Sequence, residues 1–145
     1  MVYYFSYGSN MDEEYLKLLG VSFKDKFPGV LKGFKLVFNK RTSENFSMGN
    51  LLSDPNSEVE GIIYIIDLNN LKKLDNFEPG YFREKKIVVD RNGKNFKSYV
   101  YIANSCNLAE GLKPTKDYMR KLLNEKEFLS KKYYDHLLEY YNSLV

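Results

Sequence analysis

The sequence predicts an α+β fold in which a strongly curled sheet or small β-barrel is flanked by helices. Many short segments rich in Ile, Val, Tyr and Phe are separated by Gly, Pro and Asn, as is typical of strands. A few segments instead repeat apolar residues at three- or four-residue steps, which indicates amphipathic helices. The chain has 145 residues without a repeat or linker, so we expect residues 1–145 to form a single domain.

The first half of the chain is predicted to alternate between strands and turns. Residues 2–6 form an apolar run typical of a buried strand, and residues 11–19 are expected to form a short helix that ends at Gly20. Further short strands are expected at residues 21–27, 30–31, 34–38 and 49–52, with a loop at 39–47 and a turn at 54–57.

The second half begins with the strongest strand, residues 59–66. Asp67 is then expected to cap a helix with apolar residues at three-residue steps, ended by Pro79-Gly80. The remaining elements are expected to be a hairpin of residues 82–90 and 96–103 joined through Asn92-Gly93, a loop at 104–113, and helices at 114–124 and 130–144.

The turn Tyr7-Gly8-Ser9-Asn10 is the first candidate site. A strand that passes at once into a helix leaves backbone N–H groups unpaired at the positive end of that helix. Such donors can hold a carboxylate or the oxygen of a polarised carbonyl. We expect Gly8 to allow a positive φ and close approach, and Asn10 to cap the helix with Glu13 as its capping-box partner. A well-capped turn with no ligand is an equal alternative.

Glu78 is the second candidate. It precedes a proline, so it should mark the end of its helix. The negative end of the helix dipole and burial would each disfavour the carboxylate and raise its pKa, which suits proton transfer near neutral pH. The alternative, a solvated glutamate at a helix terminus, is the commoner situation for an acidic residue.

Composition argues against several other classes of protein. The net charge of +3 comes without a dense basic block, so nucleic acid is not expected as a partner. Cys106 is the only cysteine, which rules out an internal disulfide and fits a reducing compartment, and His136 stands alone in a helical pattern, so no metal site is expected. No segment is long enough to span a membrane, and the first apolar run is too short for a signal peptide. We therefore expect a cytoplasmic protein.

The common catalytic motifs are absent. There is no phosphate-binding glycine loop, and Ser9 has no nearby histidine base in the sequence. An enzyme built on this chain would work with one carboxylate and a turn whose backbone N–H groups bind an anion. It would need no cofactor, and its substrate would carry its own nucleophile.

Several blocks resemble the gamma-glutamylcyclotransferase-like family, which includes AIG2-like and gamma-glutamylamine cyclotransferase-like proteins. The matching segments are residues 4–11 (YFSYGSNM), 59–64 (VEGIIY), 74–78 (LDNFE), 81–83 (YFR) and 98–99 (SY), with a looser match at Pro114 and Tyr118. In this chain Pro79 separates the acid from the glycine that directly follows it in many family members.

The resemblance implies a small mixed β-barrel with flanking helices and cleavage of a gamma-glutamyl amide to 5-oxoproline and a free amine or amino acid. It further implies that Tyr7, Gly8, Ser9 and Asn10 line the substrate pocket, that Glu78 is the catalytic acid/base and that Tyr99 contacts the ligand. The partner would be a small gamma-glutamyl compound; the released amine and the oligomeric state stay open.

Two other functions are compatible with the sequence. One is a non-catalytic binding module of the same fold. The other is a nucleic-acid binder that stacks bases on exposed aromatic rings, but the aromatic residues mostly alternate with Ile, Val and Leu, which favours a place in the core.

Overall fold

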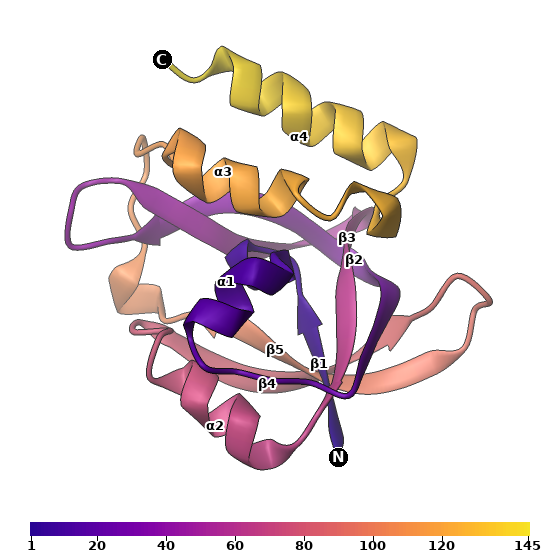
Figure 1. The fold of residues 1–145 in the computed structure, drawn as a ribbon. Coiled ribbons are helices and arrows are strands. Elements are labelled where there is room, and N and C mark those ends of the chain that lie inside the picture. The colour runs from indigo at the N-terminus through magenta and orange to yellow at the C-terminus, as the bar shows by residue number, and fades with distance from the viewer.

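Five strands close into a barrel in the computed structural model, which describes all of residues 1–145 (Figure 1). The strands are β1 (Val2–Ser6), β2 (Asp25–Arg41), β3 (Ser47–Ile66), β4 (Tyr81–Val89) and β5 (Asn95–Ala103), in the order β1-β3-β2-β4-β5. Because β1 pairs antiparallel with β3 and parallel with β5, the barrel is mixed. The predicted α+β fold with a small mixed barrel and flanking helices is confirmed.

Helices pack around the barrel. They are α1 (Glu13–Leu18), α2 (Leu68–Asp75), α3 (Lys116–Leu123) and α4 (Lys131–Ser143), with 3₁₀ turns at Ser9–Met11, Ser105–Asn107 and Lys126–Phe128. Side chains of Asp67, Thr115 and Ser130 accept hydrogen bonds from the first turns of α2, α3 and α4, so each start is fixed by an N-cap. Helices α3 and α4 lie side by side at one end of the molecule (Figure 1). None of the helices combines the length and apolar character needed to cross a membrane.

Alternating side chains on the strands build two apolar clusters. Phe5 and Ile63 belong to a cluster supplied by the strands and Tyr7, whereas their chain neighbours Tyr4 and Tyr64 belong to a larger cluster shared with the helices. Successive side chains of a strand point to opposite faces, so β1 and the last residues of β3, Ile62–Ile66, are covered on both. This explains why residues 2–5 and 62–66 are apolar without interruption.

Two long strands replace several short ones predicted between residues 21 and 66. Strand β2 runs through Gly29 and Gly33, and β3 runs through residues 54–57, so the breaks predicted there are wrong. The pairing skips from Lys32–Glu58 to Phe34–Ser53, which leaves residues 54–57 as an unpaired bulge. The carboxylate of Asp54 still accepts hydrogen bonds from Asn56 and Ser57 there. The turn chemistry was present, but cross-strand pairing on both sides of it keeps the strand continuous.

Candidate functional site

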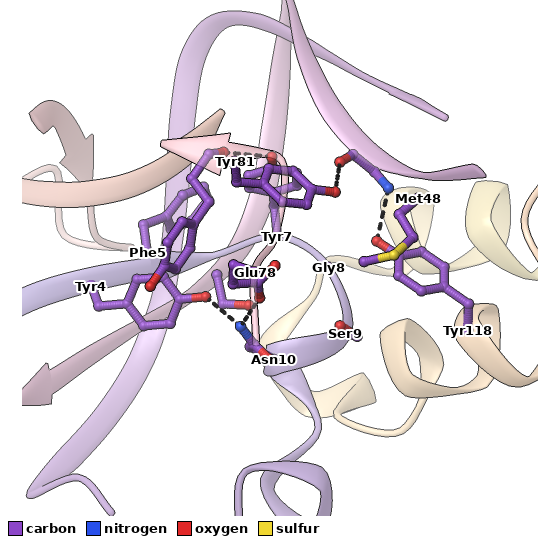
Figure 2. Close-up of a pocket in the computed structure, with 13 residues that line it drawn as sticks. Tyr4, Phe5, Tyr7, Gly8, Ser9, Asn10, Met48, Glu78, Tyr81 and Tyr118 are labelled. Carbon is purple, nitrogen blue, oxygen red and sulfur yellow. Dashed lines mark hydrogen bonds between the residues drawn. The ribbon is translucent and has the colours of Figure 1, made fainter. Parts of the chain in front are cut away.

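Segments distant in the sequence converge on one small pocket beside the start of α1 (Figure 2). Its free volume is about 30 Å³, room for one or two water molecules. The lining residues come from the end of β1 and the turn after it, from β3, β4 and β5, from the loop after α2, and from α3. They are Tyr4, Phe5, Ser6, Tyr7, Gly8, Ser9, Asn10, Met48, Gly49, Glu78, Tyr81, Tyr101 and Tyr118.

The turn after β1 lines this pocket and has free backbone donors. The carbonyl groups of Gly8 and Ser9 accept from Met11 and Asp12 at 3.1 Å, which closes the 3₁₀ turn. The N–H groups of Gly8, Ser9 and Asn10 donate to no carbonyl or side chain of the protein. Three successive donors are therefore available to an anion or a polarised carbonyl.

Gly8 has a different role from the one expected. Its φ is −127°, so the predicted positive φ is wrong. A Cβ at Gly8 would instead lie 2.9 Å from the hydroxyl oxygen of Tyr118. The residue must be glycine because Tyr118 approaches the backbone, not because of an unusual backbone conformation.

Asn10 was predicted to cap the helix with Glu13 as its capping-box partner, and this prediction is wrong. The N-cap of α1 is Asp12, whose carboxylate accepts from the N–H groups of Glu14 and Tyr15 at 3.0 and 3.4 Å. A carboxylate is a stronger acceptor than an amide oxygen at this position, and the 3₁₀ turn shifts the helix start by two residues.

The side chain of Asn10 is instead buried next to Glu78. Its Nδ2 donates to Glu78 Oε1 at 2.7 Å and to the hydroxyl oxygen of Tyr4 at 2.9 Å (Figure 2). The Tyr64 hydroxyl donates to the Asn10 carbonyl at 2.7 Å and fixes the backbone behind it. The Oδ1 atom of Asn10 is buried without a donor, so the site also holds a free acceptor beside the acid.

Glu78 reaches the pocket from a tight turn between α2 and β4. The Tyr81 N–H donates to the Glu78 carbonyl at 3.2 Å, with Pro79 and Gly80 as the central residues and Gly80 at φ +84°. Pro followed by a residue of positive φ is typical of a type II turn. Pro79 is thus accommodated, and the turn places Glu78 and Tyr81 in the same pocket wall.

The environment of Glu78 favours its neutral form. Burial raises the pKa of the carboxyl group from 4.5 to about 7, while the hydrogen bond from Asn10 and the charge of Lys40 act in the opposite direction. The negative charge of Asp75 adds to the rise. A carboxyl group with a pKa near neutrality can both accept and donate a proton at physiological pH.

Tyrosines form the rest of the wall and hold one another in place. Tyr118 accepts from the Gly49 N–H at 2.9 Å, and the Tyr81 hydroxyl donates to the Gly49 carbonyl at 2.7 Å (Figure 2). Burial raises the pKa of the hydroxyls of Tyr81 and Tyr118, so both rings stay neutral. The family resemblance had covered Tyr4, Tyr7, Tyr81 and Tyr118, but not Tyr101, which also lines the pocket. The abundance of tyrosine was the other available signal, and it does not indicate which tyrosines lie together.

The structure does not bring Tyr99 into this pocket. Tyr99 lines an adjacent surface groove, where the Arg83 guanidinium lies 4.9 Å from the centre of its ring. Tyr101, two residues further along β5, is the residue of this strand that reaches the pocket. Cys106 is exposed and lies apart from these lining residues, and no three His, Cys, Asp or Glu side chains gather in a way that could hold a metal ion.

Comparison with known proteins gives one family. A sequence model described as gamma-glutamyl cyclotransferase, AIG2-like, matches residues 4–120. No curated protein matches the chain.

Solved structures of similar proteins share the fold. The chain is 25% identical to a gamma-glutamyl cyclotransferase at a TM-score of 0.82, with 94% of this chain and 86% of that one covered. It is 27% identical to the uncharacterized protein loc79017 from Homo sapiens, with the same coverage and a TM-score of 0.81. It is 28% identical to YkqA from Bacillus subtilis at a TM-score of 0.84, where 99% of this chain matches 55% of that one.

Proposed function

Because the chain belongs to the gamma-glutamyl cyclotransferase, AIG2-like family, we propose that it converts a gamma-glutamyl amide into 5-oxoproline and a free amine or amino acid. The observation that carries this proposal is the pairing of Glu78, whose pKa is raised to about 7, with a turn of free N–H groups in one pocket. No Cys or His side chain lines that pocket. Ser6 and Ser9 line it without a histidine base, so we assign the nucleophile to the substrate.

In the proposed reaction the α-amine of the gamma-glutamyl group attacks its own γ-carbonyl carbon. A C–N bond forms to close the five-membered lactam, and the amide bond to the leaving amine breaks. Glu78 as the carboxylate takes a proton from the α-ammonium group and frees the electron pair that attacks. Once protonated, Glu78 returns this proton to the departing nitrogen, so the carboxylate is regenerated. The attacking nitrogen loses a second proton as the lactam forms, and this proton ends on the released amine, which leaves as an ammonium ion.

Intramolecular attack explains why so few catalytic groups suffice. Holding the two ends of the gamma-glutamyl group together can contribute roughly 7–11 kcal/mol toward the barrier when the geometry is pre-arranged. The N–H groups of Gly8, Ser9 and Asn10 would hold either the α-carboxylate or the oxyanion that develops on the γ-carbonyl oxygen. Removal of one such donor typically lowers the rate by about a hundredfold or more.

The Asn10 side chain supports both proton uptake by Glu78 and binding of the substrate's α-ammonium group. Its Nδ2 hydrogen bond favours the carboxylate form of Glu78 that must act as base. Its unpartnered Oδ1 is an acceptor suited to the α-ammonium group. Because the free volume is only about 30 Å³, the bound state requires lining side chains to move, and Met48 has three rotatable bonds to do so.

A panel of gamma-glutamyl compounds tests the proposal. The panel includes glutathione, gamma-glutamyl amino acids, gamma-glutamyl-ε-lysine and gamma-glutamyl amines, with 5-oxoproline and the released amine both quantified. The proposed function requires equal amounts of the two products from at least one compound. Binding of 5-oxoproline without any release would identify a non-catalytic binding module and would refute the enzymatic role.

A further inference from the structure

Lys40 is a buried lysine next to the pocket that has no anionic partner. It is 6% exposed, and its ammonium group forms no ion pair with any carboxylate of the chain. Lysine is almost never buried unless it is paired, because an isolated ammonium group loses its hydration. Burial lowers the pKa of Lys40, and the negative charge of Glu78 acts in the opposite direction.

The position of Lys40 relates it to the candidate site. Its cross-strand partner on β3 is Met48, which lines the pocket. Its Nζ lies 5.2 Å from the centre of the Tyr81 ring, another pocket residue. A Cβ at Gly80 would lie 2.8 Å from Lys40 Cε and 3.1 Å from Nζ. The ammonium group thus lies against the turn that carries Glu78, and the absence of a side chain at Gly80 leaves room for it.

Lys40 and Glu78 nevertheless do not neutralise each other. The two charges interact through space, and each opposes the effect of burial on the other, but they form no ion pair. The pocket therefore has its proton carrier in Glu78 and a separate fixed cation, Lys40, directly behind the lining residues Met48 and Tyr81. A cation in this position is suited to an anion that arrives with the substrate.

We infer that the ammonium group of Lys40 binds a carboxylate of the substrate. This inference rests on the proposed function, because it assumes that gamma-glutamyl compounds occupy the pocket. Such a compound offers two sources of carboxylate: the α-carboxylate of the gamma-glutamyl group, or the carboxylate of the amino acid that is released. In the second case Lys40 selects gamma-glutamyl amino acids over gamma-glutamyl derivatives of simple amines.

The test uses Lys40→Met, which keeps the length of the side chain and removes its charge, and Lys40→Arg, which keeps the charge. Lys32→Met is the matched control, since Lys32 is exposed on the same strand. Turnover is measured for gamma-glutamyl-alanine and gamma-glutamyl-alaninamide. Affinity is measured by calorimetry for 5-oxoproline and 5-oxoprolinamide, a readout that does not need catalysis.

A charge-assisted hydrogen bond of this kind corresponds to a roughly 10- to 100-fold effect. If the leaving amino acid supplies the carboxylate, Lys40→Met should lower kcat/KM by this 10- to 100-fold factor for gamma-glutamyl-alanine and leave kcat/KM for the alaninamide unchanged. If the α-carboxylate is the partner, Lys40→Met loses it in affinity for 5-oxoproline and not for 5-oxoprolinamide. In either case Lys40→Arg should keep most of the preference for the acid over the amide compound. Lys32→Met should keep all of this preference.

Two results would overturn the inference. One is a Lys40→Met variant within threefold of wild type on all four compounds. The other is an equal loss within both pairs, gamma-glutamyl-alanine with its alaninamide and 5-oxoproline with 5-oxoprolinamide, which would mean that Lys40 recognises no carboxylate. A shifted pH profile in that case would show that Lys40 acts on Glu78. Failure of the proposed function looks different: the wild type would release no 5-oxoproline from any compound, while calorimetry with 5-oxoproline would still report on Lys40.

Discussion

Replacement of Glu78 by Gln should stabilise the folded protein, and the gain should depend on pH. The folded pKa of about 7 exceeds the ordinary value of 4.5, so the folded state binds this proton more tightly than the unfolded state does. Stability therefore falls as pH rises between these two values. The penalty is absent when both states are protonated, below about pH 4.5, and complete above about pH 7. Glu78→Gln removes the titrating group and with it the penalty.

The size of the effect follows from the same two values. Each pH unit of difference corresponds to about 1.4 kcal/mol, so the full penalty is about 3 kcal/mol. Since part of the penalty is already present at pH 5, the advantage of Glu78→Gln over wild type should be about 2 kcal/mol larger at pH 8 than at pH 5. Groups that titrate equally in both proteins cancel in this difference.

Urea unfolding of wild type and Glu78→Gln at the two pH values gives the comparison. Glu110→Gln is the control, because Glu110 lies exposed in the loop before α3. It should show no pH-dependent gain. If the free-energy difference between Glu78→Gln and wild type were the same at pH 5 and pH 8, the carboxyl group would not be desolvated in the folded state and our account of the site would fail.

Three further changes probe the surroundings of Glu78. Asn10→Leu removes the donor that favours the carboxylate, so the acid limb of the kcat/KM profile should move up by about one pH unit; an unmoved limb would mean that Glu78 is not the titrating base. Gly8→Ala places a Cβ 2.9 Å from the Tyr118 hydroxyl oxygen and should cost about 1–3 kcal/mol in urea unfolding. Adding Tyr118→Phe should recover part of that loss, whereas strictly additive effects would argue against the contact. Tyr64→Phe leaves the Asn10 carbonyl without its donor at 2.7 Å and should destabilise the protein by about 1–3 kcal/mol, measured by the same method; a neutral result would show that the turn does not depend on it.

Local signals marked the two parts of the candidate site, although they did not decide between a site and an ordinary turn or a solvated glutamate. Glu78 stands between a helix and a proline, and Gly8 to Asn10 follow an apolar strand, so both are marked by their immediate neighbours. That they share a pocket does not follow from local sequence. The hydrogen bond between Asn10 and Glu78 depends on how the turn after β1 and the loop after α2 are placed around the barrel.

Two of the wrong predictions have different physical causes. The turn expected at residues 54–57 is favoured locally, but pairing with strand β2 on both sides of it keeps the strand continuous. The cap expected at Asn10 is replaced by a local competitor, the carboxylate of Asp12 two residues later. Lys40 was also missed, because a lysine in a polar segment gives no sign that tertiary packing will bury it.

Release of 5-oxoproline by Glu78→Gln shows whether Glu78 carries the proton while the substrate cyclises on itself. We expect a rate roughly 100- to 10,000-fold below wild type on the best compound of the panel, with 5-oxoproline still bound and Glu110→Gln fully active. Since Glu78→Gln should be more stable than wild type, unfolding could not explain such a loss. Release at the wild-type rate would contradict the claim.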